Sequence, residues 1–372
     1  MRQNSIVKIA MAWLLFLGST AHINGQHLSV NFMGSASGQP LAAANAGADI
    51  SQAATTFTMA ATTPSVGAGA WSLVSGTATI TTPSSATTTV TGIPIGTSAT
   101  LRWTITEGSC SVNDLVVLTQ KGVYVSIKAL LEGAFSSSTG LMSDALRTNT
   151  INNTTNTTRF PLQQPYNTLS FAGAPYNGTE ATTLSVLNVS GNDAIVDWVL
   201  VELRDATTPA TIIARRAVLL QADGDIVETD GTSAVLFEVG QGNYHIAVRH
   251  RNHLSVRTKN AESLSDIPKI IDFTDASNTN ILTNGSIGNY WKSITYTISS
   301  TTFTKKLLNT GDANRSGTIT GADKLAFANQ NGLLNLTYLT ATADFNLSGV
   351  VTGADKLRFS PNNGIIQPNL GQ

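Results

Sequence analysis

The segment "AIVDWVLVELRD" (Ala194–Asp205) decides the fold of the largest part of the chain. Apolar residues occupy both alternating sets of positions, so each face of a strand here would be covered. Two further apolar runs follow, "IIARRAVLLQADGDIV" and "NYHIAVRHRNHLSV", and the turn signals "ADGDI" and "TDGT" lie between the strand-like parts. We therefore expect Ala194–Asp205 to be a central strand of a β-sandwich module spanning residues 122–300.

Upstream, residues 45–121 show short strand-like segments separated by turn signals every eight to twelve residues. In "LRWTI", Leu101, Trp103 and Ile105 fall on one face of a strand, while Arg102 and Thr104 fall on the other. This alternation is typical of a half-buried strand, and the region predicts a small immunoglobulin-like β-sandwich. The strand-like segments are Thr77–Thr82, Thr87–Gly92, Thr100–Thr106 and Asp114–Thr119.

Both β regions resemble known modules. "NAGADI", "GAWSLVSGTATI" and "LRWTITEGSC" resemble the PKD-like, immunoglobulin-type modules of secreted Bacteroidota proteins. "LLEGAF", "VDWVLVELRDA" and "YHIAVRHRNHLSV" resemble a sandwich module near the C-terminus of many such proteins, some of which carry an adhesin or haemagglutinin label. The resemblance implies an exported modular protein and carries no activity with it. Cys110 is the only cysteine, so no internal disulfide can form, and we expect a small buried or half-buried side chain there.

Near the C-terminus, "DANRSGTITGADKL" (Asp312–Leu325) and "DFNLSGVVTGADKL" (Asp344–Leu357) are identical at ten of fourteen positions. A twelve-residue calcium loop needs oxygen ligands at positions 1, 3, 5, 7, 9 and 12, and glycine at position 6. Position 7 binds through its backbone carbonyl, so its side chain is free to differ between copies. The predicted ligands of two Ca²⁺ sites are Asp312, Asn314, Ser316, Thr318, Thr320 and Asp323, and then Asp344, Asn346, Ser348, Val350, Thr352 and Asp355.

Each loop is followed by a helix-forming segment, "GADKLAFA" or "GADKLRFS", and neither is preceded by a convincing helix. The apolar residues at position 8, Ile319 and Val351, are expected to join the two loops through a short backbone bridge. With two carboxylates per loop, the affinity should lie near the extracellular end of the range, about 10⁻⁴–10⁻³ M. The alternative is a pair of Asx-type turns that only resemble metal loops.

A duplicated loop with an exit helix and a final aspartate resembles a type I dockerin, here covering residues 301–372. The resemblance implies two bound Ca²⁺ ions and a cohesin-like partner. The chain departs from the dockerin pattern at position 5, where Ser316 and Ser348 replace the usual aspartate. It departs again at Gly321–Ala322 and Gly353–Ala354, where side chains that recognise cohesin are expected. These departures weaken the expectation of a cohesin partner more than that of calcium.

The N-terminal sequence is typical of a targeting segment. Arg2 and Lys8 precede the short apolar run Ile9–Gly18, which predicts a cleaved signal peptide over residues 1–25, with a linker over 26–44. That run is too short to span a bilayer comfortably, and no second long apolar stretch follows. Charged residues make up 12% of the chain and the net charge is −1, which argues against a nucleic-acid partner.

Other clusters are weaker candidates. His245, His250 and His253 lie in one stretch, but on a strand His250 would point away from the other two, so a metal site is not expected there. The acidic segment "ADGDIVETDG" predicts a solvated hairpin, with a third calcium site as the alternative. Trp198 and Trp291 are candidates for an exposed carbohydrate platform, although Trp198 also fits a core position.

These observations predict a mainly β, secreted, non-catalytic calcium-binding protein that serves adhesion or docking at a cell surface or matrix. Its partner would be an extracellular protein or a glycan. The alternative is a dockerin-bearing accessory component, or an enzyme, of polysaccharide degradation. Common catalytic signatures such as G-x-S-x-G, H-E-x-x-H and the P-loop are absent from the sequence, so we predict no enzymatic activity.

Overall fold

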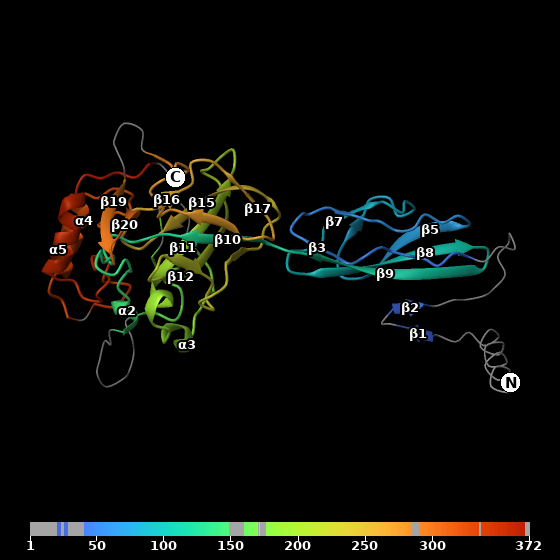
Figure 1. Cartoon of the computed structure of the whole chain (residues 1–372), viewed down its shortest axis with the longest axis horizontal. Helices are drawn as coiled ribbons and strands as arrows, with labels where there is room; N and C mark the ends of the chain where they lie inside the picture. The colour runs from blue at the N-terminus through green and yellow to red at the C-terminus, as the bar shows by residue number, and fades with distance from the viewer. Residues whose placement is uncertain are drawn as a thin grey trace. The chain divides into compact units, whose positions relative to one another are not determined.

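The computed structural model describes residues 21–23, 26–28, 41–148, 160–169, 171, 176–283, 290–334 and 336–368. The chain is mainly β, with several antiparallel sheets and few helices, as the sequence predicts (Figure 1). It divides into two compact units, one formed by Met1–Gly122 with Glu238–Gln241, the other by Val123–Phe237 with Gly242–Gln372. Most of the predicted signal peptide and linker lies outside the described residues. No helix in the described ranges is long and apolar enough to cross a membrane.

The first unit contains two sheets that enclose one core. Its longest strands alternate buried and exposed residues, and Leu101, Trp103 and Ile105 of β8 are buried as predicted. The rings of Trp71 and Trp103 pack at 5.1 Å between centroids, and Cys110 is buried. The four-stranded sheet has the order β3 (Ile50–Gln52), β9 (Cys110–Gln120), β8 (Ser98–Glu107) and β5 (Ala68–Ser75), and the three-stranded sheet has the order β4 (Phe57–Thr58), β7 (Thr89–Thr91) and β6 (Thr79–Ile80). A separate two-stranded sheet pairs β1 (Ala21–Ile23) with β2 (Gln26–Leu28).

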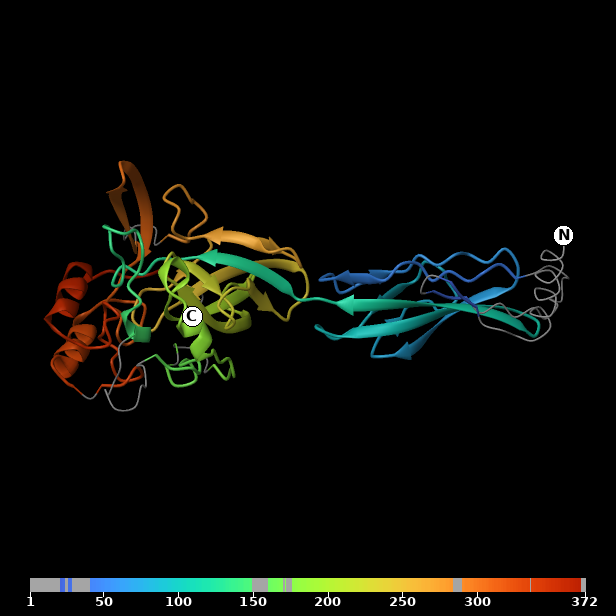
Figure 2. The same ribbon diagram turned by 60° about the horizontal axis from the view of Figure 1, so that its bottom comes forward.

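The second unit is built on one nine-stranded, mostly antiparallel sheet, seen from another side in Figure 2. Its centre is β11 (Ile195–Asp205), of which ten of eleven residues are buried, as expected for a strand covered on both faces. The main path runs β14 (Val235–Phe237), β10 (Val123–Lys128), β13 (Asp225–Val227), β12 (Ile212–Gln221), β11, β15 (Gly242–Arg249) and β16 (Val256–Arg257), while β17 (Glu262–Leu264) pairs with β15 and β18 (Lys269–Asp272) pairs with β10 in parallel.

Two acidic residues interrupt the apolar pattern of β11, and both are fully buried. Glu202 accepts hydrogen bonds from Arg204 at 2.6 Å and Arg215 at 3.1 Å, and Arg249 lies 3.0 Å away. These guanidinium groups balance the negative charge of the Glu202 carboxylate. A buried carboxylate needs such partners because it has lost its contact with water. The second acidic residue, Asp197, connects the sheet to the C-terminal region and is described below.

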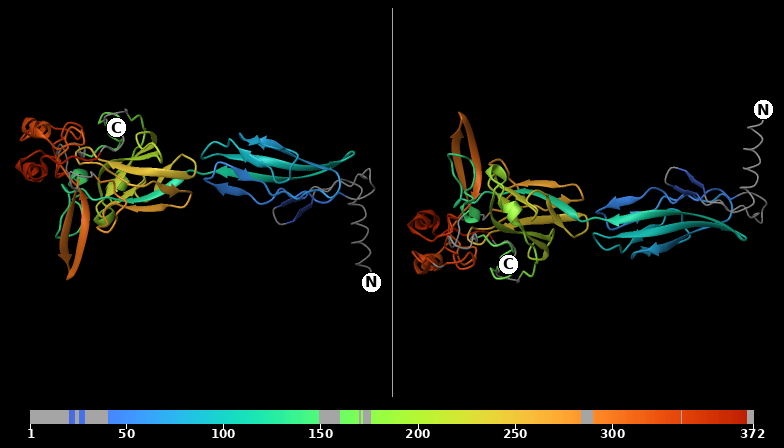
Figure 3. Two further views of the ribbon diagram at one scale, coloured as in Figure 1. Left: turned by 90° about the horizontal axis from the view of Figure 1, so that it is seen from above. Right: turned by 90° about the horizontal axis from the view of Figure 1, so that it is seen from below.

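The C-terminal region belongs to this second unit and does not form a compact unit of its own. A two-stranded hairpin, β19 (Trp291–Ile298) and β20 (Thr301–Leu308), leads into it and extends away from the large sheet in both views of Figure 3. The helices α4 (Gly321–Gln330) and α5 (Gly353–Phe359) then lie side by side, each after one repeated loop, as predicted. Shorter helical segments are α2 (Ala145–Thr148), α3 (Leu184–Leu187), η1 (Gly191–Asp193) and η3 (Ser360–Asn362).

Candidate metal centre

The first repeated loop, Asp312–Asp323, closes around the carboxylate at its position 1; we call it and its copy calcium loops after the ligand that the sequence predicts. Asp312 accepts hydrogen bonds from the backbone N–H groups of Ser316 and Gly317, both at 2.9 Å. The chain turns sharply there, since Arg315 and Gly317 have φ angles of 60° and 79°. A left-handed conformation at position 6 is the reason that calcium loops require glycine at that position.

The carboxylate at position 12 turns back into the same loop. Asp323 accepts hydrogen bonds from the N–H of Asn314 at 3.2 Å and from the N–H of Thr320 at 2.8 Å. Thr320 also caps α4, because its hydroxyl accepts a hydrogen bond from the N–H of Ala322 at 3.3 Å. Both Asp312 and Asp323 are buried, at 4% and 0% exposure, so neither carboxylate extends into water.

The second calcium loop, Asp344–Asp355, reproduces this arrangement. Asp344 accepts from the N–H groups of Ser348 at 2.9 Å and Gly349 at 2.8 Å. Asp355 accepts hydrogen bonds from the N–H of Asn346 at 3.1 Å and from the N–H of Thr352 at 2.8 Å, the positions that correspond to Asn314 and Thr320 of the first loop. Leu347 and Gly349 have φ angles of 57° and 83°. The two loops therefore share one internal geometry.

The remaining predicted ligands gather beside the carboxylates. Asn314 Oδ1 accepts a hydrogen bond from the N–H of Ser316 at 3.0 Å, and Ser316 Oγ lies 3.1 Å from the carbonyl oxygen of Thr318. In the second loop the corresponding distances, from Asn346 to Ser348 and from Ser348 to Val350, are also 3.0 and 3.1 Å. The oxygens of positions 3, 5 and 7 are thus neighbours. The hydroxyls of position 9, Thr320 and Thr352, cap the helices, which suits a position that often binds calcium through water.

The electrostatics of the loops favour a cation. Burial raises the pKa of Asp312 to about 7, hydrogen bonds from backbone N–H groups oppose the shift, and the nearby Asp323 carboxylate adds to it. Burial likewise raises the pKa of Asp344 to about 6, against the effect of Arg251, and also raises the pKa of Asp355. Two close, buried carboxylates resist joint ionisation, and a divalent ion between them would remove that penalty.

The donor set resembles that of a calcium site and differs from that of a transition-metal site. Within the described ranges no group of three or more His, Cys, Asp or Glu side chains could hold a metal ion. Each loop offers two carboxylates, and its other donors are amide, hydroxyl and carbonyl oxygens, which are the ligands of hard cations. The same hydrogen bonds also satisfy the Asx-turn alternative. The burial of both carboxylates in each loop is the feature that turns alone do not require and that a bound cation would explain.

One prediction for the loops is wrong. Ile319 and Val351 are buried, but they do not join the loops through a backbone bridge. The N–H of Ile319 donates to the carbonyl of Ile365 at 2.9 Å, and its carbonyl accepts from Gly364 at 2.7 Å. The Val351 carbonyl accepts from the N–H of Gly332 at 2.9 Å. The chain after α5 folds back and takes the place that the second loop was expected to fill.

Both loops are held next to the large sheet by residues 250–253, which directly follow β15. The Asn252 carbonyl accepts hydrogen bonds from the N–H groups of Gly311 at 3.0 Å and Asp312 at 3.2 Å. Its side-chain amide donates to the carbonyl of Asp344 at 2.7 Å. Asn252 therefore holds the first residue of each calcium loop, and it is fully buried.

Arg251, the residue before Asn252, also contacts the C-terminal region, through hydrogen bonds and its charge. Its Nε donates to Asp197 at 3.0 Å, its Nη1 donates to the carbonyl of Ala341 at 2.8 Å, and its Nη2 lies 3.6 Å from a carboxylate oxygen of Asp344. The guanidinium also lies 4.5 Å from the ring centroid of Tyr338. One buried arginine thus neutralises an acid of the sheet and approaches a predicted calcium ligand.

Asp197 is the centre of this network and was not singled out by the sequence analysis. It accepts hydrogen bonds from Arg251 and from the hydroxyl of Tyr338, and His250 Nε2 lies 3.0 Å away. Burial opposes ionisation, but Arg251 and His250 lower the pKa of Asp197 to about 2. A charged residue within the apolar pattern of β11 was the available signal that a buried partner exists.

The histidine prediction is partly wrong. β15 ends at Arg249, so strand alternation does not continue to His250 and His253, whose rings meet at 4.8 Å between centroids. His253 Nε2 accepts a hydrogen bond from the N–H of Gly133 at 3.1 Å. His245 is buried separately, beside the carbonyl of Thr258. The histidines serve packing within the second unit.

Gly133, in the turn after β10, shows how closely the second loop approaches that turn. A side-chain carbon at this position would overlap the carbonyl oxygen of Phe345, the second residue of that loop. The same carbonyl accepts a hydrogen bond from the hydroxyl of Thr310 at 3.1 Å. The "LLEGAF" segment of the sequence therefore needs glycine because a calcium loop packs against its backbone.

Two further candidates are not supported. Trp198 and Trp291 are 0% and 9% exposed, so the expected aromatic platform is wrong for both residues. The acidic groups of "ADGDIVETDG" are paired with basic residues, since Glu228 lies 2.8 Å from Arg216, whereas Asp223 and Asp225 lie 3.5 and 2.9 Å from Lys128. That segment forms turns around β13, as the hairpin interpretation predicts.

Comparison with known proteins does not extend this description. No protein-family model matches the chain, and no curated protein sequence matches it.

Proposed function

We propose that the protein binds two Ca²⁺ ions, one in each loop, and that the ions stabilise the C-terminal region on the nine-stranded sheet. The observation that carries this proposal is that the same arrangement of buried carboxylates occurs in both loops. In both loops the carboxylates of positions 1 and 12 are buried, and each accepts two backbone hydrogen bonds from within its own loop. A turn motif alone gives no reason for two close, buried carboxylates to recur after 32 residues.

The charge of the loops sets the expected affinity. Two carboxylates balance one divalent ion, so affinity should lie near the extracellular range, with a Kd of about 10⁻⁴–10⁻³ M. At a free calcium concentration one hundred times the Kd, each site would stabilise the folded state by about 2.7 kcal/mol. Because Asn252 and Arg251 contact the loops, this stabilisation would reach the large sheet.

The role we propose is adhesion or docking by an exported, non-catalytic modular protein at a cell surface or matrix, with a protein or a glycan as partner. Two β units of different construction support a modular role. The N-terminal apolar segment supports export. The dockerin-like order of loop and helix supports docking, although glycine and alanine at the start of each helix offer little for a cohesin-like partner to recognise.

The test is calorimetric titration of Ca²⁺ into the full chain after divalent ions have been removed on a chelating resin. We expect two ions per chain and a higher melting temperature. The double variant Asp323→Asn with Asp355→Asn should bind none, while the control Asp205→Asn, the same type of substitution at the end of β11, should bind both. A wild-type chain that gives no heat and no thermal shift in millimolar Ca²⁺ would refute the proposal.

A further inference from the structure

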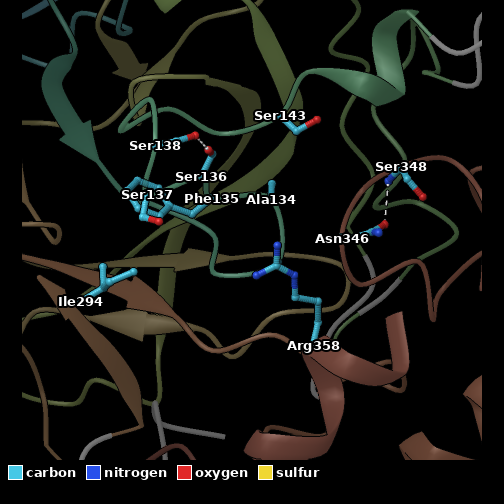
Figure 4. A pocket seen from close by; sticks show the side chains of 11 residues that line it. Ala134, Phe135, Ser136, Ser137, Ser138, Ser143, Ile294, Asn346, Ser348 and Arg358 are labelled. Carbon is cyan, nitrogen blue, oxygen red and sulfur yellow. Dashed lines mark hydrogen bonds between the residues drawn. The ribbon is translucent and has the colours of Figure 1, made fainter. Parts of the chain in front are cut away.

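The second calcium loop borders a pocket with a volume of about 490 Å³ (Figure 4). One wall is the turn after β10, with Phe135 and the serines 136–138, and Ser143 and Ile294 add to the rim. Asn346 and Ser348, positions 3 and 5 of the second loop, face the same space. The volume is within the range of small-molecule sites.

The pocket is polar and its charge is positive. None of its lining residues is an aspartate or a glutamate, and Arg358 is its only lining residue with a charged side chain. Figure 4 shows the Arg358 side chain reaching from α5 toward Ala134. Arg358 is exposed, and no described residue forms an ion pair or side-chain hydrogen bond with its guanidinium. A guanidinium in this state is suited to bidentate binding of a carboxylate.

Serine hydroxyl groups line the same pocket as this cation. Ser136 and Ser138 lie 2.8 Å apart between their hydroxyl oxygens, and Ser137 and Ser143 line the same space. Serine hydroxyls both donate and accept hydrogen bonds, so a row of them matches a ligand that carries several hydroxyls. Ile294, which is half-buried, supplies a small apolar surface against which the carbon face of a sugar ring could pack.

The position of the second loop connects the pocket to calcium. Asn346 Oδ1 accepts a hydrogen bond from the N–H of Ser348 at 3.0 Å, which fixes both residues at the pocket edge (Figure 4). The opposite wall is held to the same loop, because Gly133 packs against the carbonyl of Phe345. An ion in the loop would therefore order the pocket and would offset the negative charge of Asp344 and Asp355 next to it.

We infer that this pocket binds a carboxylate-bearing saccharide, of the uronic-acid class, and that it does so when the second loop holds calcium. The inference rests on the proposed calcium function and adds the chemical class of the partner. Arg358 pairs with the carboxylate, the serines bind the ring hydroxyls, and the ordered second loop maintains the shape of the site.

Digalacturonate titrated into the calcium-loaded full chain tests the inference, with a titration into calcium buffer as reference. We expect binding by the wild type, none by the uncharged disaccharide galactobiose, and binding weakened about tenfold or more in Arg358→Gln, from the loss of a charge-assisted pair. Lys356→Gln, the matched charge change on α5 outside the pocket, should leave digalacturonate binding unchanged. Protein stripped of divalent ions on a chelating resin should lose this binding.

Each opposite result has a distinct meaning. Equal digalacturonate affinity in Arg358→Gln and the wild type, equal affinity for galactobiose, or full binding by stripped protein would overturn the inference. Normal calcium heat without any digalacturonate heat would remove the pocket inference and leave the calcium proposal intact. Absence of calcium heat in the wild type would instead refute the proposed function. Ca²⁺ titration of Arg358→Gln should still give two ions, which shows that the variant retains both loops.

Discussion

The two calcium loops agree in their interior and differ in their surroundings. Inside each loop, hydrogen bonds of the same kind agree within 0.1 Å, because the same spacing of acceptors and glycine recurs. Outside, Asp344 has the buried Arg251 at 3.6 Å, and the pKa of Asp344 rises less than that of Asp312, to about 6 compared with about 7. The two copies thus share the internal hydrogen bonds of the loop and differ in the residues that contact it.

The partners of the loops show the same division. The second loop contacts Gly133, in the turn after β10, and Arg251, just after β15. The first loop is braced by the end of the chain, where the N–H of Gln367 donates to the carbonyl of Gly317 at 2.9 Å. The Gln367 side chain in turn accepts from the N–H of Ser255 at 2.8 Å. We expect the second loop to depend mainly on the sheet and the first to depend mainly on calcium.

Arg251→Met should have the largest effect. It leaves Asp197 and Asp344 buried without their cation, and removing one partner of a buried ion pair costs about 3–5 kcal/mol. Arg315→Met is the comparison, because it removes a half-buried arginine from the first loop. It should lower the free energy of unfolding by about 1 kcal/mol or less. Chemical denaturation of both variants without calcium measures the difference. Equal losses of stability would contradict the proposed division between the loops.

Gly133→Ala should come next. The added methyl overlaps the Phe345 carbonyl, so the loop and the turn after β10 must separate, and we expect a loss of about 3 kcal/mol. The calcium stoichiometry should fall from two to one, because only the second loop loses its support. Gly353→Ala is the control, since a side-chain carbon there meets no atom within 4 Å. Two full-affinity calcium sites in Gly133→Ala would show that this contact is not needed.

Asp323→Asn and Asp355→Asn compare the loops as binding sites. Each variant should lose at least about tenfold in affinity at its own site, equivalent to about 1.4 kcal/mol, while the other site is unchanged. Calorimetry should resolve one remaining ion in each case. In the calcium-saturated protein Asp323→Asn should lower the melting temperature more, because the first loop has less support from the sheet. The reverse order of melting temperatures would contradict that expectation.

The smallest effect concerns pH in metal-free protein. The folded state holds a proton on Asp312 and Asp344 more tightly than the unfolded chain, because their pKa values are raised to about 7 and about 6. Their contribution to stability is complete below the unfolded pKa near 4 and is lost as pH rises through 6 and 7. Metal-free protein should therefore become more stable from pH 8 to pH 5, while calcium binding weakens over the same range. Asp312→Asn should remove the part of this change near pH 7, and an identical pH profile in that variant would contradict the assignment.

The sequence predicted what depends on local spacing. Buried and exposed residues alternate in β8 as the "LRWTI" pattern requires, and β11 is buried because its pattern is apolar on both faces. The loops were predictable for the same reason, since a glycine and acceptor oxygens within twelve residues define them. The helices α4 and α5 begin at the predicted segments because position 9 caps them.

The contacts between distant segments were not predictable. Asn252 bonds to Asp344 across 92 residues, and Tyr338 bonds to Asp197 across 141. No periodicity relates such positions, because their partners are chosen by tertiary packing. Ile319 illustrates the consequence: its need for a backbone partner was foreseen, but Ile365 fills that place and the second loop does not.

A crystal structure of the full chain grown with Ca²⁺ would test the central claim most directly. The account predicts anomalous difference density for one ion in each loop, with six to eight oxygen ligands at about 2.3–2.6 Å, including the carboxylates of positions 1 and 12. Loops that retain the hydrogen bonds described here but hold no ion at millimolar calcium would contradict it.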